Sequence, residues 1–463
     1  MKRLSFLLLM ACQACSMAPK YERPASPVPD KYDSPALPAD VALESGEDAT
    51  LNDWRQHFTD PKLQKVIEAA LAHNRDLKIA ALRVDEFRAL YQIQRAERIP
   101  NIAANGTFIR GKQIDPATGV GVTGNQYQAS VGLTSFEVDF FGRVKSLSDA
   151  ALSQYLASEA GLRAAQITLV AETANAYIRE LSLGQQEQLA INTLKSREDT
   201  LTIDKSRLDA GVSNILELKT SVMLVESARA RIAEVRRERE QNRNALRILV
   251  GSFDFTPEAE TLGVEAIEFP ELKGGLSSDL LARRPDIIQA EELLKSANAN
   301  IGAARAAFFP SISMTSSIGS VSNDFDKLFK AGTEVWSFIP QINIPIFAGG
   351  RNKANLDAAH VRKDIAVVQY EQAIQNSFRE VRDSLVAHDL LRLQVNAQKA
   401  VRDADFERAR LAQKRYERGV SGYLEYLDAQ RSQFESDQTY LRLHELRLNY
   451  DISLYRALGG GWR

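Results

Sequence analysis

Hydrophobic and polar residues alternate in several short segments of this chain. The pattern is clear over 127–134, 311–318 and 338–346, where apolar residues occur at alternate positions and mostly small or polar residues stand between them. A period of two predicts strands with one apolar and one polar face. Segments of about ten such residues are typical of strands that cross an outer membrane, although a half-buried strand of a soluble sheet has the same pattern.

Two long tracts of the chain contain no proline, the residue that breaks helix interiors. The first lies between Pro116 and Pro257, and the second follows Pro345. Apolar residues recur there three and four positions apart, which predicts very long helices over about 144–208 and 352–416. At 1.5 Å per residue, a helix of roughly 60 residues extends about 90 Å and must pack against neighbours, as in a coiled coil. Shorter helices are predicted over 61–98, 215–250, 278–306 and 424–457.

The chain contains the same sequence pattern twice. Pro100 matches Pro310 at a separation of 210 residues, and the Gly-Val-Ser triplet that starts at Gly211 matches the one that starts at Gly419 at a separation of 208. The separation changes only once, by two residues between Pro100 and Gly142, where the loop of the first copy is longer, and is 208 from there on. This pattern indicates an internal duplication, with a helix, a strand hairpin, a long helix and a final helix in each copy. The predicted organisation is a signal peptide over 1–14, an extended tether over 15–60, a first repeat over 61–270 and a second repeat over 271–463.

The predicted strands number four, two in each copy, and four strands are too few to close a barrel. Lipid does not tolerate the open edges of a sheet. If these strands cross a membrane, several chains must therefore pool them. The helices alone would also fit a soluble coiled coil.

The N-terminus has the features of a secretory signal. Lys2 and Arg3 precede an apolar run over 4–11, which is far shorter than the roughly 20 residues of a spanning helix. Cys12 and Cys15 follow this run, and no other cysteine occurs. A cysteine at this place is the expected acceptor for bacterial lipidation. The residues before Cys12 fit the Leu-x-small-Cys rule better, whereas Cys15 gives a less abbreviated signal, so this part of the sequence leaves both open.

Composition and motifs argue against an enzyme and against a nucleic-acid-binding protein. The 463 residues include 58 Lys and Arg and 60 Asp and Glu, a formal charge of -2, and no domain is strongly basic. The GxGxxG pattern over 119–124 lies between two predicted strands, so we interpret it as a hairpin tip and not as a nucleotide site. The five His are not spaced as metal ligands, and no Ser or Cys lies in a nucleophile motif. We therefore expect no catalytic site, no cofactor and no metal site.

Seven longer motifs are distributed over essentially the whole chain. They are CSMAPKYERP at 15–24, NRDL at 74–77, DFFGR at 139–143, RPDI at 284–287, ANIGAARAAFFPS at 299–311, LDAQRS at 427–432 and ALGGGW at 457–462. In these motifs and their order the chain resembles the outer-membrane factors of tripartite efflux systems. It is similar to TolC and closer to the OprM-like and CusC-like lipoprotein branch.

The resemblance implies an α+β fold and a homotrimer. Each protomer would give four strands to one outer-membrane β-barrel and its long helices to one periplasmic α-helical barrel. The implied partners are a periplasmic adaptor (membrane fusion) protein, an inner-membrane pump of the resistance–nodulation–division type and outer-membrane lipid. The resemblance places the lipid on Cys15, because the family's Ser-x-x-Pro-x-Tyr-x-Arg-Pro pattern follows it, although Cys12 stands where the family usually has Leu. The implied location is the outer membrane, with a lipid anchor and an extension into the periplasm.

The periplasmic gate of the family maps onto the last turn and last helix of the second repeat. By this resemblance Tyr416 is the aromatic residue of the gate's bond network, and Leu424 is the apolar ring residue. Glu425 and Asp428 resemble the acidic positions, and Arg431 resembles a partnering base. Three copies of Asp428 around one axis would repel each other and favour cations. On an anonymous helix, Asp428 on a solvated face and Leu424 in ordinary packing would be the simpler interpretation.

The expected function is that of the outer-membrane channel of an efflux pump, which passes drugs or other small molecules to the exterior. Efflux of heavy-metal cations is the main alternative. A structural coiled-coil lipoprotein of the envelope is an alternative from another class.

Overall fold

The computed structural model describes residues 16–29, 53–114, 117, 119–255, 263–270 and 283–460. The predicted signal peptide, both cysteines and most of the predicted tether lie outside these residues. The chain divides into two units. Unit 1 comprises Met1–Ala25, Leu82–Ala160 and Ile288–Gln372, and unit 2 comprises Ser26–Ala81, Gly161–Ile287 and Ala373–Arg463.

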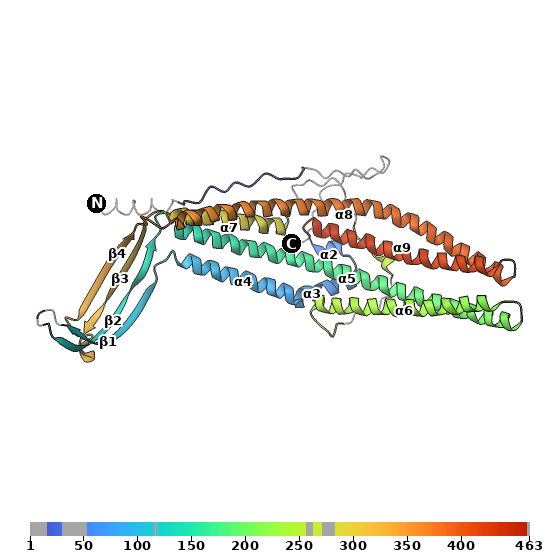
Figure 1. Cartoon of the computed structure of the whole chain (residues 1–463), viewed down its shortest axis with the longest axis horizontal. Coiled ribbons are helices and arrows are strands. Elements are labelled where there is room, and N and C mark those ends of the chain that lie inside the picture. The colour runs from blue at the N-terminus through green and yellow to red at the C-terminus, as the bar shows by residue number, and fades with distance from the viewer. Residues whose placement is uncertain are drawn as a thin grey trace. The chain divides into compact units, whose positions relative to one another are not determined.

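Unit 1 contains one antiparallel sheet of four strands in the order β1-β2-β3-β4 (Figure 1). The strands are β1 (Ile102–Ile114), β2 (Gly121–Val138), β3 (Ser311–Ser322) and β4 (Glu334–Asn343). Four strands are therefore present, as the alternation predicted, and β1 and β4 form the two edges of the sheet.

The register places the apolar side chains on one face of this sheet. Phe108 pairs with Tyr127 across β1 and β2, and Ile318 pairs with Trp336 across β3 and β4. Because side chains alternate along a strand, the same face also carries Ile102, Val131, Leu133, Phe136, Ile312, Met314, Phe338 and Ile342. The opposite face is mainly small and polar, with Asn105, Thr107, Gln126, Gln128, Ser130, Ser313, Thr315, Ser317, Ser337 and Gln341.

Two local features of β2 refine what the sequence predicted. A bulge between Leu133 and Phe136, with Ser135 at a φ of 48°, inserts one residue and returns Phe136 to the apolar face. The interpretation of 119–124 as a hairpin tip is correct only for its first residues. Gly119 lies in the turn at a φ of 66°, whereas β2 already begins at Gly121.

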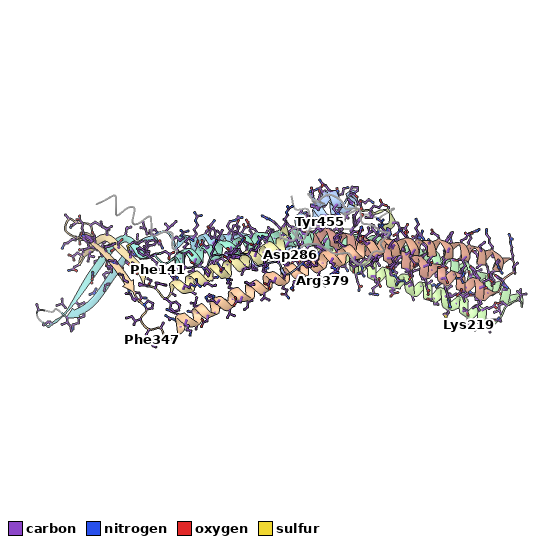
Figure 2. All side chains as sticks on the ribbon, turned by 90° about the horizontal axis from the view of Figure 1, so that it is seen from above. Phe141, Lys219, Asp286, Phe347, Arg379 and Tyr455 are labelled. Carbon is purple, nitrogen blue, oxygen red and sulfur yellow. The ribbon has the colours of Figure 1, made fainter. Side chains whose placement is uncertain are left out.

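Four helices contribute residues to unit 1: α4 (Arg75–Ala96), α5 (Arg143–Asp209), α7 (Pro285–Ala306) and α8 (Arg351–Glu417). The carboxylate of Asp139 accepts a hydrogen bond of 2.7 Å from the backbone N–H of Lys145 and so caps α5. Phe141, labelled in Figure 2, stacks on Phe309 with the ring centroids 4.8 Å apart.

Residues 16–25 form an N-terminal strap that is bonded to the part of α7 in unit 1. The side chain of Asn298 donates a 2.8 Å hydrogen bond to the carbonyl of Pro19. The Arg23 guanidinium forms an ion pair of 2.6 Å with Glu291. A Cβ atom at Gly302 would lie 2.7 Å from the backbone N of Ala18. The strap can therefore approach α7 this closely only because residue 302 is glycine.

Unit 2 consists of helices packed around one hydrophobic core. Its own helices are α2 (Trp54–His57), α3 (Pro61–His73), α6 (Ile215–Val250) and α9 (Tyr423–Ala457), and α5 and α8 also contribute. Fully buried core side chains include Phe58, Leu63, Ile67, Ile178, Leu246, Leu448, Ile452 and Tyr455 (Tyr455 is labelled in Figure 2). The two very long helices predicted from the proline-free tracts are confirmed as α5 and α8. Within the described residues, no helix combines the length and the apolar character needed to cross a lipid bilayer.

The single helix predicted over 61–98 is wrong, because the chain breaks at Asn74 between α3 and α4. The Asn74 side chain donates a 2.9 Å hydrogen bond to the carbonyl of Leu249 and accepts one of 2.9 Å from the N–H of Leu77. Nearby, Gly251 ends α6 at a φ of 74°. A Cβ atom there would lie 2.3 Å from the carbonyl oxygen of His73. Because this contact joins segments that are far apart in the sequence, the apolar periodicity of residues 61–98 does not reveal the break at Asn74.

Candidate functional site

All five predicted gate residues lie where α8 ends and α9 begins, within unit 2. Tyr416 is in the last turn of α8, and Gly419 in the following turn has a φ of 71°. Leu424 and Glu425 lie in the first turn of α9. Asp428 and Arg431 follow on the same helix. The duplicated turn that contains Gly211 connects α5 and α6 in the same way.

A buried carboxylate on α5 connects this turn to the other helix pair. The hydroxyl of Tyr416 donates a 3.1 Å hydrogen bond to Asp204, whose side chain is fully buried. Ser221 on α6 donates to the other carboxylate oxygen of Asp204. The Ser221 hydroxyl also lies 2.7 Å from the hydroxyl of Tyr423 on α9. These bonds join α5, α6, α8 and α9 at one point, which we call the Asp204 cluster.

Tyrosine rings surround the Asp204 cluster. Tyr416 stacks on Tyr426 with centroids 5.2 Å apart and an interplanar angle of 7°. The guanidinium carbon of Arg207 lies 4.8 Å from the centre of the Tyr416 ring. Burial and the negative charge of Asp204 raise the pKa of the Tyr416 hydroxyl well above its ordinary value of 10.0. The phenol therefore stays protonated and remains a donor.

The charged gate residues lie at the surface. Asp428 forms an ion pair with Arg408 of α8, and about half of each side chain or more is exposed. Glu425 lies 3.6 Å from Arg415. In the described part of the chain Arg431 makes no ion pair, so the base that partners Asp428 within one chain is Arg408. Burial is the main cause of the lowered pKa of the Arg197 guanidinium, and the positive charge of Arg431 lowers this pKa further.

Leu424 differs from Tyr416 in its surroundings. Its side chain is 76% exposed, whereas Tyr416 is 5% exposed. Leu424 is therefore a large apolar side chain in the first turn of α9 that remains mostly exposed in the single chain. The structure thus separates the five residues into one buried anchor, Tyr416, and four surface positions.

Sequence reasoning missed Asp204, the centre of this cluster, and its partner Ser221. A signal for them exists in the duplication, because the two copies differ at these positions. At the offset of 208, Asp204 corresponds to Ala412 and Ser221 to Ala429. Asp204 and Ser221 would both have been identified by comparing the two copies and selecting positions that are polar in the first copy and alanine in the second.

Comparison with known proteins identifies one family. The sequence model described as "Outer membrane efflux protein" matches residues 66–252 and 276–460. The cation efflux system protein CusC of Escherichia coli O6:H1 is 42% identical over 466 residues, which cover 100% of this chain and 99% of CusC. The toluene efflux pump outer membrane protein TtgC of Pseudomonas putida is 42% identical over 455 residues, covering 97% of this chain and 93% of TtgC.

The fold is also that of a solved channel. The open state of the MtrE outer membrane channel of Neisseria gonorrhoeae superposes with a TM-score of 0.85 at 38% identity, covering 97% of this chain and 99% of MtrE. The predicted fold class, a mostly helical protomer with four strands that belongs with the outer-membrane channels, is confirmed.

Proposed function

Because the chain belongs to the outer membrane efflux protein family, as its motifs indicated, we propose that it forms the homotrimeric outer-membrane duct of a tripartite efflux system. Three copies pool their strands into one barrel and their long helices into a periplasmic α-helical barrel. A periplasmic adaptor and an inner-membrane pump of the resistance–nodulation–division type deliver drugs or other small molecules to it. The duct acts by opening and has no catalytic step.

One observation carries this proposal: the sheet has one apolar face, one polar face and two open edges. Trp336, Phe338 and Ile342 are all more than half exposed on the apolar face of edge strand β4. Such a face is costly in water and favourable in lipid. The open edges of β1 and β4 are not tolerated in lipid unless other strands pair with them. Several copies of this sheet satisfy both requirements.

The test is the mass of the protein after gentle detergent extraction from outer-membrane fractions, measured by light scattering. We expect a stable trimer that fractionates with the outer membrane. A monomer in detergent would contradict the duct. Recovery in the soluble periplasmic extract would instead favour a coiled-coil scaffold.

We assign the closed entrance of the duct to the segment from Tyr416 to Arg431. The Asp204 cluster supports this, because it fixes the α8–α9 turn to α5 and α6 by hydrogen bonds. The surface ion pair of Asp428 contributes only about 0–1 kcal/mol, so an adaptor can separate it. Leu424, uncovered in the single chain, would meet its copies around the trimer axis.

The cargo is selected by the pump and not by the duct. Relatives named for cations and for toluene are equally similar to this chain. The polar face of the sheet, which would line the barrel, is uncharged over the described strand residues except for Glu137, and Glu137 is paired with Arg143. No group of three His, Cys, Asp or Glu side chains that could hold a metal occurs in the described residues. Cross-linking in native membranes, followed by identification of the captured adaptor and pump, would identify the cargo class.

A further inference from the structure

Three charged side chains lie on the apolar face of the sheet. Arg110 and Lys112 are on edge strand β1, two and four residues beyond Phe108, and Glu334 is the first residue of edge strand β4. The register places all three on the face of Phe108 and Trp336. Each is exposed, and none forms an ion pair within the described chain. A charge on a lipid-facing surface is unfavourable unless it is paired or reaches the headgroups.

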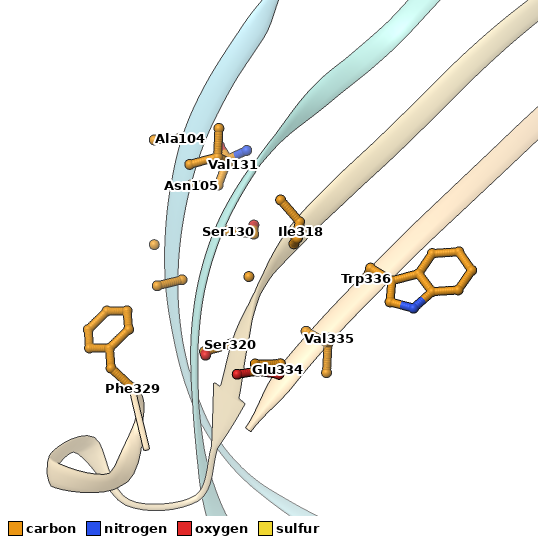
Figure 3. Close-up of a pocket in the computed structure, with 13 residues that line it drawn as sticks. Ala104, Asn105, Ser130, Val131, Ile318, Ser320, Phe329, Glu334, Val335 and Trp336 are labelled. Carbon is orange, nitrogen blue, oxygen red and sulfur yellow. The ribbon is translucent and has the colours of Figure 1, made fainter. Parts of the chain in front are cut away.

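The positions of these charges are complementary. The cations are on one edge of the sheet and the carboxylate is on the other. Figure 3 shows Glu334 and Trp336 on β4, beside Ile318 and Ser320 of β3. The outer sides of β1 and β4 have no strand partner in the single chain, so a second copy of this chain is the occupant that supplies both missing edges. This step rests on the proposed trimer.

The lengths of the two edge strands restrict how copies can pair. β4 has 10 residues and β1 has 13. If all of β4 pairs antiparallel with β1 of the next copy, Glu334 must stand opposite residue 111, 112, 113 or 114. Apolar faces must also match, because a shift of one residue turns every side chain to the other face. The even positions of β1 carry the apolar face, which leaves Lys112 and Ile114.

The side chains distinguish these two registers. With Lys112 opposite Glu334, opposite charges are neighbours, Trp336 faces Arg110 and Phe338 faces Phe108. Direct cross-strand pairs of opposite charge, of a cation with an indole and of two aromatic rings are all favourable. With Ile114 opposite Glu334, Trp336 still faces a cation, Lys112, but the carboxylate faces an apolar side chain and Phe338 faces Arg110 instead of an aromatic ring. The ion pair and the aromatic pair therefore favour Lys112.

We propose that the seam between neighbouring copies pairs Glu334 of one chain with Lys112 of the next, and Trp336 with Arg110. In the single chain the Lys112 side chain lies over Gly121 of β2, and it turns toward the seam when the next copy binds. The occupant of the seam is a second copy of this chain, in one defined register.

Cysteine cross-linking in native outer membranes tests the register. Residues directly opposite on neighbouring strands have Cβ atoms about 4.5–5.5 Å apart, which is close to disulfide geometry. We would compare Glu334→Cys combined with Lys112→Cys, with Ile114→Cys, or with Ala104→Cys as the distant control. After oxidation, a denaturing non-reducing gel should show a covalent trimer with the Lys112 pair and little with the other two. The unaltered sequence, whose two cysteines, Cys12 and Cys15, lie at the N-terminus, provides the background.

A charge exchange tests the ion pair itself. Glu334→Lys and Lys112→Glu should each lower the temperature at which the trimer dissociates in detergent, and the double exchange should restore most of the loss. Lys330→Glu, in the loop before β4, serves as a matched control and should change little. Two results would overturn the proposed pairing of Glu334 with Lys112 but not the trimeric duct. One is stronger cross-linking through Ile114→Cys than through Lys112→Cys. The other is a double exchange whose trimer dissociates at a temperature no higher than that of the single exchanges. A monomeric wild type overturns the duct, and the seam with it.

Discussion

At the scale of single residues, the segment that we propose as the entrance combines a strong buried contact with weak surface contacts. Tyr416 donates to the buried carboxylate of Asp204, and loss of a buried hydrogen-bond partner typically costs about 1–3 kcal/mol. The Asp428–Arg408 pair is largely exposed and is worth about 0–1 kcal/mol. Opening should therefore begin at the surface positions while the Asp204 cluster holds the turn together.

The first prediction concerns those surface positions. Leu424→Ala with Asp428→Ala should raise the single-channel conductance well above that of the nearly closed wild type, because it removes the apolar ring and the charge that we place at the constriction. The preference for cations should weaken as well. Planar-bilayer recordings on a confirmed trimer give both readouts. If conductance and ion selectivity do not change, the entrance lies elsewhere, although the duct would survive that result.

A second residue-scale prediction concerns acid sensitivity. His57 is stacked between Phe269 and Tyr455, with centroids 5.3 and 5.0 Å away. Burial lowers its pKa from 6.5 to about 4. The unfolded chain therefore binds a proton that the folded chain does not, and stability present above pH 6.5 is lost as the pH falls toward 4. The maximum loss is about 3 kcal/mol.

His57→Phe keeps the stacking and removes the titrating group. Its melting temperature should therefore depend less on pH between 7 and 4 than that of the wild type. His73→Gln, at an exposed position, is the control and should keep the wild-type slope. Parallel slopes for His57→Phe and the wild type would show that another group causes the acid sensitivity.

At the scale of elements, the long helices and the strands could be predicted from the sequence because their signals are local. α5 and α8 follow from tracts without proline, and both ends agree with the prediction within one residue. The break at Asn74 could not be predicted, since it depends on a bond to Leu249 far along the chain. Asp204 was missed because its partners, Tyr416 and Ser221, are on two other helices, and only a comparison of the two copies marks its position in the sequence.

The close approach at Gly251 gives an element-scale prediction. Gly251→Ala should destabilise the protein by more than strain alone, because the new Cβ would lie 2.3 Å from a backbone oxygen. Gly211→Ala is a matched control: its φ of 71° is nearly the same, but nothing lies within 4 Å of its Cβ position. We expect a loss of about 1–2 kcal/mol for Gly211→Ala from strain and a clearly larger loss for Gly251→Ala. If Gly251→Ala and Gly211→Ala lower the melting temperature equally, α3 and α4 must move away from the new side chain without loss of stability.

At the scale of the whole molecule, the two copies keep one polar contact at corresponding positions but build it from different residues. Arg243 on α6 donates a 2.9 Å hydrogen bond to Glu180 on α5. At the offset of 208, the corresponding pair is Asp451 on α9 and His388 on α8, 2.7 Å apart. The acidic residue has moved from the long helix to the last helix. This correspondence agrees with the offset of 208, whereas the repeat bounds 61–270 and 271–463 remain a prediction.

The N-terminal strap gives a prediction about the lipid anchor. Burial raises the pKa of Glu291, but its bonds to Arg23 and Tyr21 and the charge of Lys295 outweigh this and lower it. Glu291 is therefore ionised near neutral pH and binds the strap without help from a lipid. A single acyl chain anchors only marginally. Cys15→Ala should thus reduce signal processing more than trimer assembly.

Labelled fatty acid and the mass of the extracted protein would measure the two effects. Cys12→Ala is the paired variant and should still incorporate the label. Label retained by Cys15→Ala but lost from Cys12→Ala would move the lipid to Cys12. Loss of the trimer in Cys15→Ala would show that the bonds of the N-terminal strap are not sufficient for trimer assembly without the lipid.

The Asp204 cluster has a consequence for what the closed entrance can sense. Its phenol holds its proton far above neutrality, and buried contacts are screened by salt much less than exposed ones. Acidification or a change in ionic strength outside the cell would thus leave the Tyr416 side of this contact unaltered. The proposed entrance would therefore stay closed through such changes and open only when a partner protein binds to it.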